Sequence, residues 1–351
     1  MNESWENLAR IDGFRIVRLL IVWSLVLSVV GTERAWADQP RVRTLEYDHV
    51  RKVWAEASPP PALGTPEGDL HAIRVQIRVE RFAEALSSSK AFIKRHGRSD
   101  PLYPAVAIAR AEALIGQGDY CKAHKQLKEF LDQYYVEELT AEALRLEFVI
   151  AETFLGGVKR KFLGIRMLSG VDLAQSILDD ISISFPDSEL APAAIKTKAD
   201  HLFKTGEHAL AQMEYERLVR EYPANRHVRF ALRRAADAAL ASFAGVPYDE
   251  TPLLDSEERF REYDFHYPTE ADHEGVGLIL DSIRSQRAAK DCAVGQYYEK
   301  TDHISSAVFY YRRVCENWPD TVAATRAKLR LELIGDAGQV PGSSMEGGGE
   351  R

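Results

Sequence analysis

The chain has 351 residues, of which 45% are apolar and 28% are charged, and it carries a formal net charge of −8. This composition supports a large buried core, and the length allows one or two domains or one longer array. A nucleic-acid-binding protein would show a basic face, for which this acidic sequence gives no sign. The densest basic run, Lys159–Lys161, is interpreted as a solvated loop rather than a phosphate or partner site.

The N-terminus has the features of a cleaved secretory signal peptide. The apolar stretch Leu19–Val30 follows Arg15 and Arg18 and precedes the small-x-small sequence Ala35–Ala37. Signal peptidase requires small side chains at such a site, so residues 1–37 are predicted to be a signal peptide and the protein to be exported. The stretch has about 12 residues, whereas a bilayer core needs roughly 20. An uncleaved membrane anchor is the alternative.

Two further segments differ in composition from the rest. Residues 38–68 contain "SPPPALGTPEGD" and are predicted to be a proline-rich linker. The glycine-rich residues 336–351 are predicted to be a disordered tail. Between them, residues 69–335 show an almost uninterrupted helical pattern, and the absence of long alternating β-branched runs makes strands unexpected.

The sequence contains three cysteines, Cys121, Cys292 and Cys315. None follows the predicted cleavage point, where a bacterial lipoprotein carries its lipid-bearing cysteine. Association with a membrane is therefore expected only through other proteins. Three cysteines do not form a disulfide framework. Either Cys292 and Cys315 pair within one hairpin, or all three are small buried hydrophobic residues.

A recurring register precedes four prolines, each of which follows an aromatic residue. A small residue lies twelve positions before each proline, and large apolar residues lie eight and five positions before it. These offsets place all three on one face of a helix, and the proline then ends that helix. In chain order the residues at these positions are Ala174, Leu178, Ile181 and Pro186; Ala211, Tyr215, Leu218 and Pro223; Ser256, Phe260, Tyr263 and Pro268; and Ala307, Tyr311, Val314 and Pro319.

This pattern is that of tetratricopeptide repeats, helical hairpins with a period of 34 residues in which a small residue allows close helix crossing. The predicted fold is an all-α superhelical array of tetratricopeptide-like hairpins, an α-solenoid. Two hairpins have insertions between their helices, at Gly156–Gly170 and Ala244–Pro252. The expected hairpins occupy about 69–97, 101–135, 138–186, 189–223, 225–268 and 272–319, and a closing helix occupies about 321–335.

The sequence shows no constellation of catalytic residues, so we predict that the protein is not an enzyme and that it binds no cofactor or metal. The acidic pairs Asp179–Asp180 and Glu257–Glu258 are interpreted as solvated helix faces. Repeat arrays of this type bind peptides or partner helices on the face formed by the first helix of each hairpin. The residues predicted to line that face are Ile108, Glu112, Ile115, Lys196, Asp200, Phe203 and Lys204.

The last hairpin is more distinctive than a generic repeat. It contains Arg287–Ala289, the pair Tyr297–Tyr298, the turn Thr301–His303, Ala307 and the closing sequence Glu316–Thr321. In these features the chain resembles the BamD family of outer-membrane β-barrel assembly factors. The resemblance extends well over residues 185–335 and loosely over residues 70–184.

The resemblance implies a periplasmic, helical scaffold, peripheral at the outer membrane, that binds other envelope proteins. The implied partners are a β-barrel insertase and unfolded barrel substrates. The missing lipid-bearing cysteine and the two insertions depart from the family pattern. A periplasmic scaffold for peptidoglycan or cell-division machinery is the alternative function, and a structural link between the two membranes is another if the signal is not cleaved.

Overall fold

The computed structural model describes residues 45–48, 53–56, 61–134, 136–162 and 165–337. The predicted signal peptide and almost all of the predicted tail lie outside these residues. The chain divides into two compact units, Met1–Pro59 and Pro60–Arg351.

The described part of the first unit is an antiparallel pair of strands, β1 (Leu45–Asp48) and β2 (Val53–Glu56), with Tyr47 opposite Trp54. Both strands lie within the segment predicted to be a linker. The absence of strands was expected only for residues 69–335, so this pair lies outside that expectation. Aromatic and β-branched residues in a run as short as four favour a paired strand without producing a long alternating pattern.

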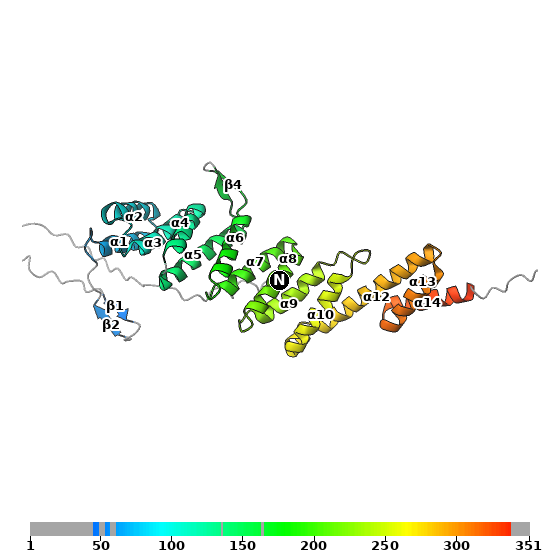
Figure 1. The fold of residues 1–351 in the computed structure, drawn as a ribbon. Coiled ribbons are helices and arrows are strands. Elements are labelled where there is room, and N and C mark those ends of the chain that lie inside the picture. The colour runs from blue at the N-terminus through cyan, green and yellow to red at the C-terminus, as the bar shows by residue number, and fades with distance from the viewer. Residues whose placement is uncertain (1–44, 49–52, 57–60, 135, 163–164, 338–351) are drawn as a thin grey trace, which may run out of the picture. The chain divides into compact units, whose positions relative to one another are not determined.

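The described part of the second unit is helical except for one small hairpin (Figure 1). The prediction of an all-α array of hairpins is confirmed. In chain order the helices are α1 (Pro66–Arg78), α2 (Phe82–His96), α3 (Tyr103–Gly116), α4 (Tyr120–Gln133), α5 (Glu137–Leu155), α6 (Val171–Ser184), α7 (Ala191–Thr205), α8 (His208–Glu221), α9 (Val228–Ala241), α10 (Thr251–His266), α11 (Pro268–His273), α12 (Val276–Lys300), α13 (Ile304–Asn317) and α14 (Val322–Ala337).

Six helix pairs reproduce the predicted hairpins to within a few residues. Helices that follow each other in the chain pack together, as α7 packs on α8 and α8 on α9. The predicted insertion after α5 contains the antiparallel hairpin β3 (Arg160–Phe162) and β4 (Ile165–Leu168), so the expectation that residues 69–335 contain no strands is wrong at this point. The short helix α11 was not expected from the sequence, because Pro268 begins it at a position where proline is tolerated.

The predicted register is also the packing register. All four small residues, Ala174, Ala211, Ser256 and Ala307, are fully buried, and the large residues four and seven positions after them are at most 1% exposed. A small side chain at the crossing lets two helices approach, and the larger side chains fill the space on either side. This register therefore sets how closely the two helices of these four hairpins pack.

The aromatic residue before each proline caps a helix. Tyr222 ends α8 and its hydroxyl donates to the carbonyl of Pro186, 2.9 Å away, at the corresponding end of the preceding hairpin. Trp318 ends α13 and is buried in the last core cluster. The residue before a proline avoids helical geometry, so the chain turns there and the ring packs between neighbouring hairpins.

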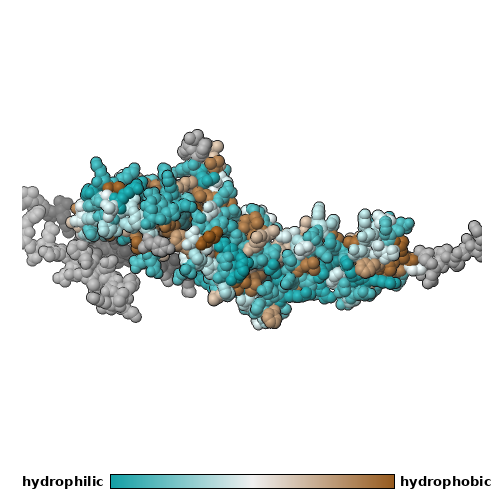
Figure 2. Space-filling model, in the orientation of Figure 1, coloured by the Kyte–Doolittle hydropathy of each residue, from teal (hydrophilic) through white to brown (hydrophobic). Residues whose placement is uncertain are grey.

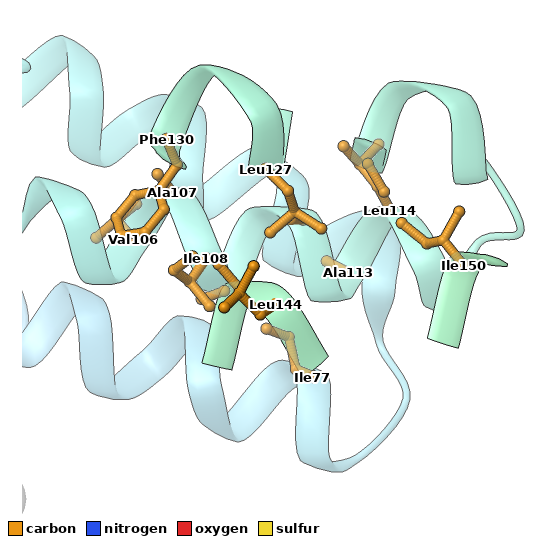
Figure 3. Packing of buried hydrophobic residues seen from close by; sticks show 14 of the residues in the cluster. Ile77, Val106, Ala107, Ile108, Ala113, Leu114, Leu127, Phe130, Leu144 and Ile150 are labelled. Carbon is orange, nitrogen blue, oxygen red and sulfur yellow. The ribbon is translucent and has the colours of Figure 1, made fainter. Parts of the chain in front are cut away.

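The core of the first three hairpins is continuous and extends to Ala194 on α7 (Figure 3). Figure 3 shows Ile108 of α3 among these buried side chains, together with Leu144 of α5 and Ile77 of α1. The α3 helix has neighbours on several sides, since it contacts α1, α2, α4 and α5. Its buried surface is correspondingly wide.

Gly295 of α12 permits the closest approach in the last hairpin. A Cβ atom added there would lie 2.8 Å from the ring of Tyr311, which is fully buried. Gly277, on the same helix, has nothing within 4 Å of the corresponding position. The two glycines therefore form a matched pair for testing the crossing.

We predict that Gly295→Ala lowers the free energy of unfolding by about 1–3 kcal/mol, because the added methyl group overpacks the crossing. Gly277→Ala should leave stability unchanged or raise it by up to about 1 kcal/mol, since alanine favours helix. Urea denaturation of both variants measures the difference. Equal stability of the two variants would contradict the close crossing.

Candidate functional site

The predicted residues of α7 lie on one stripe of that helix, and two of them, Lys196 and Phe203, contact side chains of α9. The Lys196 ammonium lies 4.4 Å from the centre of the Phe230 ring, and the Arg234 guanidinium lies 3.7 Å from that of Phe203. Both contacts have the geometry of a cation–π interaction. We call the surface formed by Lys196, Asp200, Phe203, Lys204, Phe230 and Arg234 the α7–α9 surface.

Asp200 lies at the centre of the polar contacts in this surface. Its carboxylate accepts hydrogen bonds from the Lys196 ammonium at 2.7 Å and from the Tyr215 hydroxyl at 2.5 Å. The Tyr215 side chain is fully buried, so burial first and the bond to Asp200 second raise the pKa of its hydroxyl. Tyr215 stays protonated and orients the carboxylate.

The α9 helix brings more positive charge to the same region. Arg229 and Arg233 both bind Glu274, at 3.2 and 3.1 Å. Together with Lys196, Lys204 and Arg234 they make five cations, against the three carboxylates of Asp200, Asp237 and Glu274. The region is thus basic within an acidic chain. Lys204 is exposed and Phe203 is half-buried, so both remain accessible.

His227, which precedes α9, reports the same excess of positive charge. Burial first, and then the cations of Arg226 and Lys196, lower the pKa of its imidazole. The imidazole is therefore less readily protonated than an isolated histidine. An anionic group bound to this surface would therefore interact with lysine and arginine side chains, whose charge is permanent, rather than with a charged histidine.

The sequence prediction missed the contribution of α9. Phe230 and Arg234 follow Lys196 and Asp200 by one repeat period of 34 residues. Equivalent positions of successive first helices lie side by side in such arrays. Adding the period to each predicted α7 residue would have found them.

The three residues predicted on α3 do not form an equivalent surface. Ile108 is 2% exposed, so the structure corrects its assignment: it belongs to the core between α3 and α5 and is not accessible to a partner. Glu112 is exposed and Ile115 is half-buried. Partial desolvation first, and then the nearby carboxylate of Glu142, raise the pKa of Glu112. The cation–aromatic contact at the start of α3, where the Arg98 guanidinium lies 5.9 Å from the centre of the Tyr103 ring, involves none of these three residues.

Arg287 and Ala288 of the distinctive last-hairpin sequence have structural roles. Arg287 donates to Glu257 of α10 at 2.5 Å and lies 5.5 Å from the Trp318 ring, and Ala288 is fully buried. Glu257 is only 4% exposed and also pairs with Arg261. The interpretation of Glu257 as part of a solvated face is therefore wrong, because α12 covers it.

The paired tyrosines of the same hairpin differ in exposure. Tyr298 stacks on Tyr310 with ring centres 5.5 Å apart, whereas Tyr297 is 62% exposed. Arg313 lies over Tyr310 and forms a two-point ion pair with Asp291, which is 4% exposed. Tyr298 thus belongs to the packing of the hairpin, and Tyr297 is available at its surface.

The described residues contain no cluster of histidine, cysteine and carboxylate groups able to hold a metal ion. Cys121, Cys292 and Cys315 are free thiols, of which Cys292 is buried and the other two are half-buried. Within the same residues, none of the helices combines the length and the apolar character that crossing a bilayer requires.

Comparison with known proteins gives one family. The model of the YfiO family, described as outer membrane lipoprotein, matches residues 168–335, from the end of β4 to α14. The matched segment includes the whole α7–α9 surface and the last hairpin. No curated protein is significantly similar to the chain.

Two solved structures are similar to the chain at low identity. One is the C-terminal part of a TPR repeat-containing protein from Cytophaga hutchinsonii, with 11% identity, a TM-score of 0.25 and coverage of 74% of this chain and 98% of that one. The other is a tetratricopeptide repeat protein from Parabacteroides merdae, with 12% identity, a TM-score of 0.34 and coverage of 76% and 98%. At such scores these likenesses carry no argument.

We predict that Arg287→Ala lowers the free energy of unfolding by about 2 kcal/mol, because it removes a charged hydrogen bond from buried Glu257. Arg284→Ala on the same helix is the matched control, since Arg284 forms only an exposed pair with Asp281 at 3.9 Å. The control should change stability by no more than about 0.5 kcal/mol. Chemical denaturation distinguishes the two; an Arg287 variant as stable as the control would contradict the role assigned to the pair.

Proposed function

We propose that the protein is an exported, periplasmic scaffold that binds other envelope proteins during the assembly of outer-membrane β-barrel proteins. The observation that carries this proposal is the match of the outer membrane lipoprotein family to residues 168–335, because that segment contains the α7–α9 surface and the last hairpin. The helical array supports a function by contact, since repeat proteins of this kind present extended binding faces.

The chemistry of the α7–α9 surface supports a partner segment that carries both apolar and acidic side chains. Phe203 and Phe230 offer aromatic faces, and the cations around them favour carboxylates. Lys196 and Arg234 already lie against these rings, so the surface is ordered before a partner binds. Binding then costs less conformational entropy than it would on a mobile surface.

The proposed partners are a β-barrel insertase and unfolded barrel substrates. The sequence features of a signal peptide support export, and association with the outer membrane is proposed to occur through these partners. The proposed function includes no catalytic step. The protein holds its partners in fixed positions along the helical array.

We predict that the double change Phe203→Ala and Lys204→Glu weakens partner capture about tenfold, because it removes one aromatic anchor and reverses one exposed charge. Capture is measured with the tagged protein in detergent-solubilised envelopes. Phe265→Ala combined with Lys90→Glu is the matched control, since Phe265 is 81% exposed and neither residue lies in the α7–α9 surface. Thermal denaturation of both variants establishes that they are folded.

Recovery of a β-barrel insertase by the native protein and the control, with loss in the double variant, supports the proposal. Recovery of cell-division or peptidoglycan proteins alone would replace the assembly function with the alternative one. Equal capture by the double variant and the control would exclude the α7–α9 surface as the binding site.

A further inference from the structure

The insertion between α5 and α6 builds a basic pocket that the proposed scaffold function does not use. The hairpin of β3 and β4 extends from the helices (Figure 1), and β3 contacts α4. A cavity of about 320 Å³ lies there, lined by Gly118–Lys122, Phe154 and Lys159–Lys161. Its volume is at the lower end of the range for small-molecule sites, about 300–1,000 Å³.

Four of the residues that line this pocket are cationic, and one is acidic. The acidic residue, Asp119, binds the ammonium groups of Lys161 and Lys122, the latter at 3.2 Å. Lys161 first and Lys122 second hold the pKa of Asp119 below its usual range, so the carboxylate stays charged. One charge of the four is thereby compensated, and the pocket keeps a net positive charge although the whole chain carries −8.

Hydrogen bonds and ion pairs with neighbouring residues hold two of the basic side chains of the pocket, those of Arg160 and Lys161, in position. Arg160 donates from Nε to the carbonyl of Ser169 at 2.7 Å, which leaves the terminal nitrogens of its guanidinium for other acceptors. Lys159 is exposed, and no ion pair joins it to another of the residues that the structure describes. Lys159 and Lys161 are exposed, as expected from the sequence, but Arg160 and Lys161 belong to strand β3 rather than to a loop, and Lys161 binds Asp119 at the start of α4.

Tyr120 and Phe154 give the pocket one apolar wall, and the adjoining strand carries exposed apolar side chains. Phe154 is buried behind the charges, and its ring meets that of Tyr120 edge-on at 5.7 Å. On β4, Met167 is 58% and Leu168 45% exposed. Figure 2 shows apolar surface on this hairpin, above a largely hydrophilic face. Exposed apolar side chains beside clustered cations are typical of segments that lie on an anionic bilayer.

We propose that this pocket binds the phosphate-bearing headgroup of an anionic phospholipid while Met167 and Leu168 enter the adjoining apolar layer. The cations of Lys159, Arg160 and Lys161 bind the headgroup, and Phe154 and Tyr120 form the apolar wall. This inference concerns a different surface from the proposed protein-binding function, and it adds a direct contact with a bilayer to the association through partners proposed above.

The test is flotation of the purified full chain with vesicles of phosphatidylcholine alone or of phosphatidylcholine containing phosphatidylglycerol. The native protein should bind only the anionic vesicles, and added salt should weaken binding. Lys159→Glu should weaken it about tenfold, because reversing one charge near an anionic surface removes an attraction and adds a repulsion. Lys90→Glu, an equal charge reversal on an exposed position of α2, should bind like the native protein.

Two further measurements distinguish a lipid from a soluble phosphate. The double change Met167→Ser and Leu168→Ser should weaken vesicle binding while all the cations remain. Glycerol 1-phosphate, added in solution, should compete only weakly, since it lacks the apolar chains. Equal binding to both vesicle types, or an equal effect of Lys159→Glu and Lys90→Glu, would overturn the proposal. Tight binding of glycerol 1-phosphate without vesicle binding would replace the lipid with a soluble ligand.

Discussion

Close crossing of the two helices in each hairpin is the constraint on which the other features depend. The four small residues of the register are completely buried, and side chains of that size allow the helices to cross closely. Large side chains on either side then fill the remaining space at the density of a protein interior. A larger residue at a crossing would separate the helices and shift the positions of every side chain that one hairpin presents to the next.

The same register connects the core to the surface. Tyr215 and Tyr311 occupy equivalent positions, with buried rings, and their hydroxyls reach carboxylates on the first helix of their own hairpin, Asp200 and Glu299. Burial first, and then the Glu299 carboxylate, raise the pKa of the Tyr311 hydroxyl, as Asp200 does for Tyr215. The ring of each tyrosine is fixed in the core, and its hydroxyl fixes the orientation of a carboxylate at the surface. The surface is therefore ordered from within the protein.

Each proposed binding surface uses this framework in its own way. The α7–α9 surface arises from residues that recur with the repeat period, so the packing of successive hairpins places Phe203 under Arg234. The basic pocket arises from an insertion, where β3 leaves the helical register and brings Lys161 to Asp119 at the start of α4. The proposed binding of a partner protein and the proposed binding of a lipid headgroup therefore use different residues.

The sequence by itself determined the helical hairpins, their ends and the residues at each crossing. Proline stereochemistry and the helical period act within a single helix, so they can be read from neighbouring residues. Tertiary structure alone decided which of the remaining positions are accessible. Ile108 is buried because α5 covers it, and Glu257 is buried because α12 covers it. Burial of this kind depends on residues that are distant in the sequence. The periodicity of a single helix carries no information about those residues.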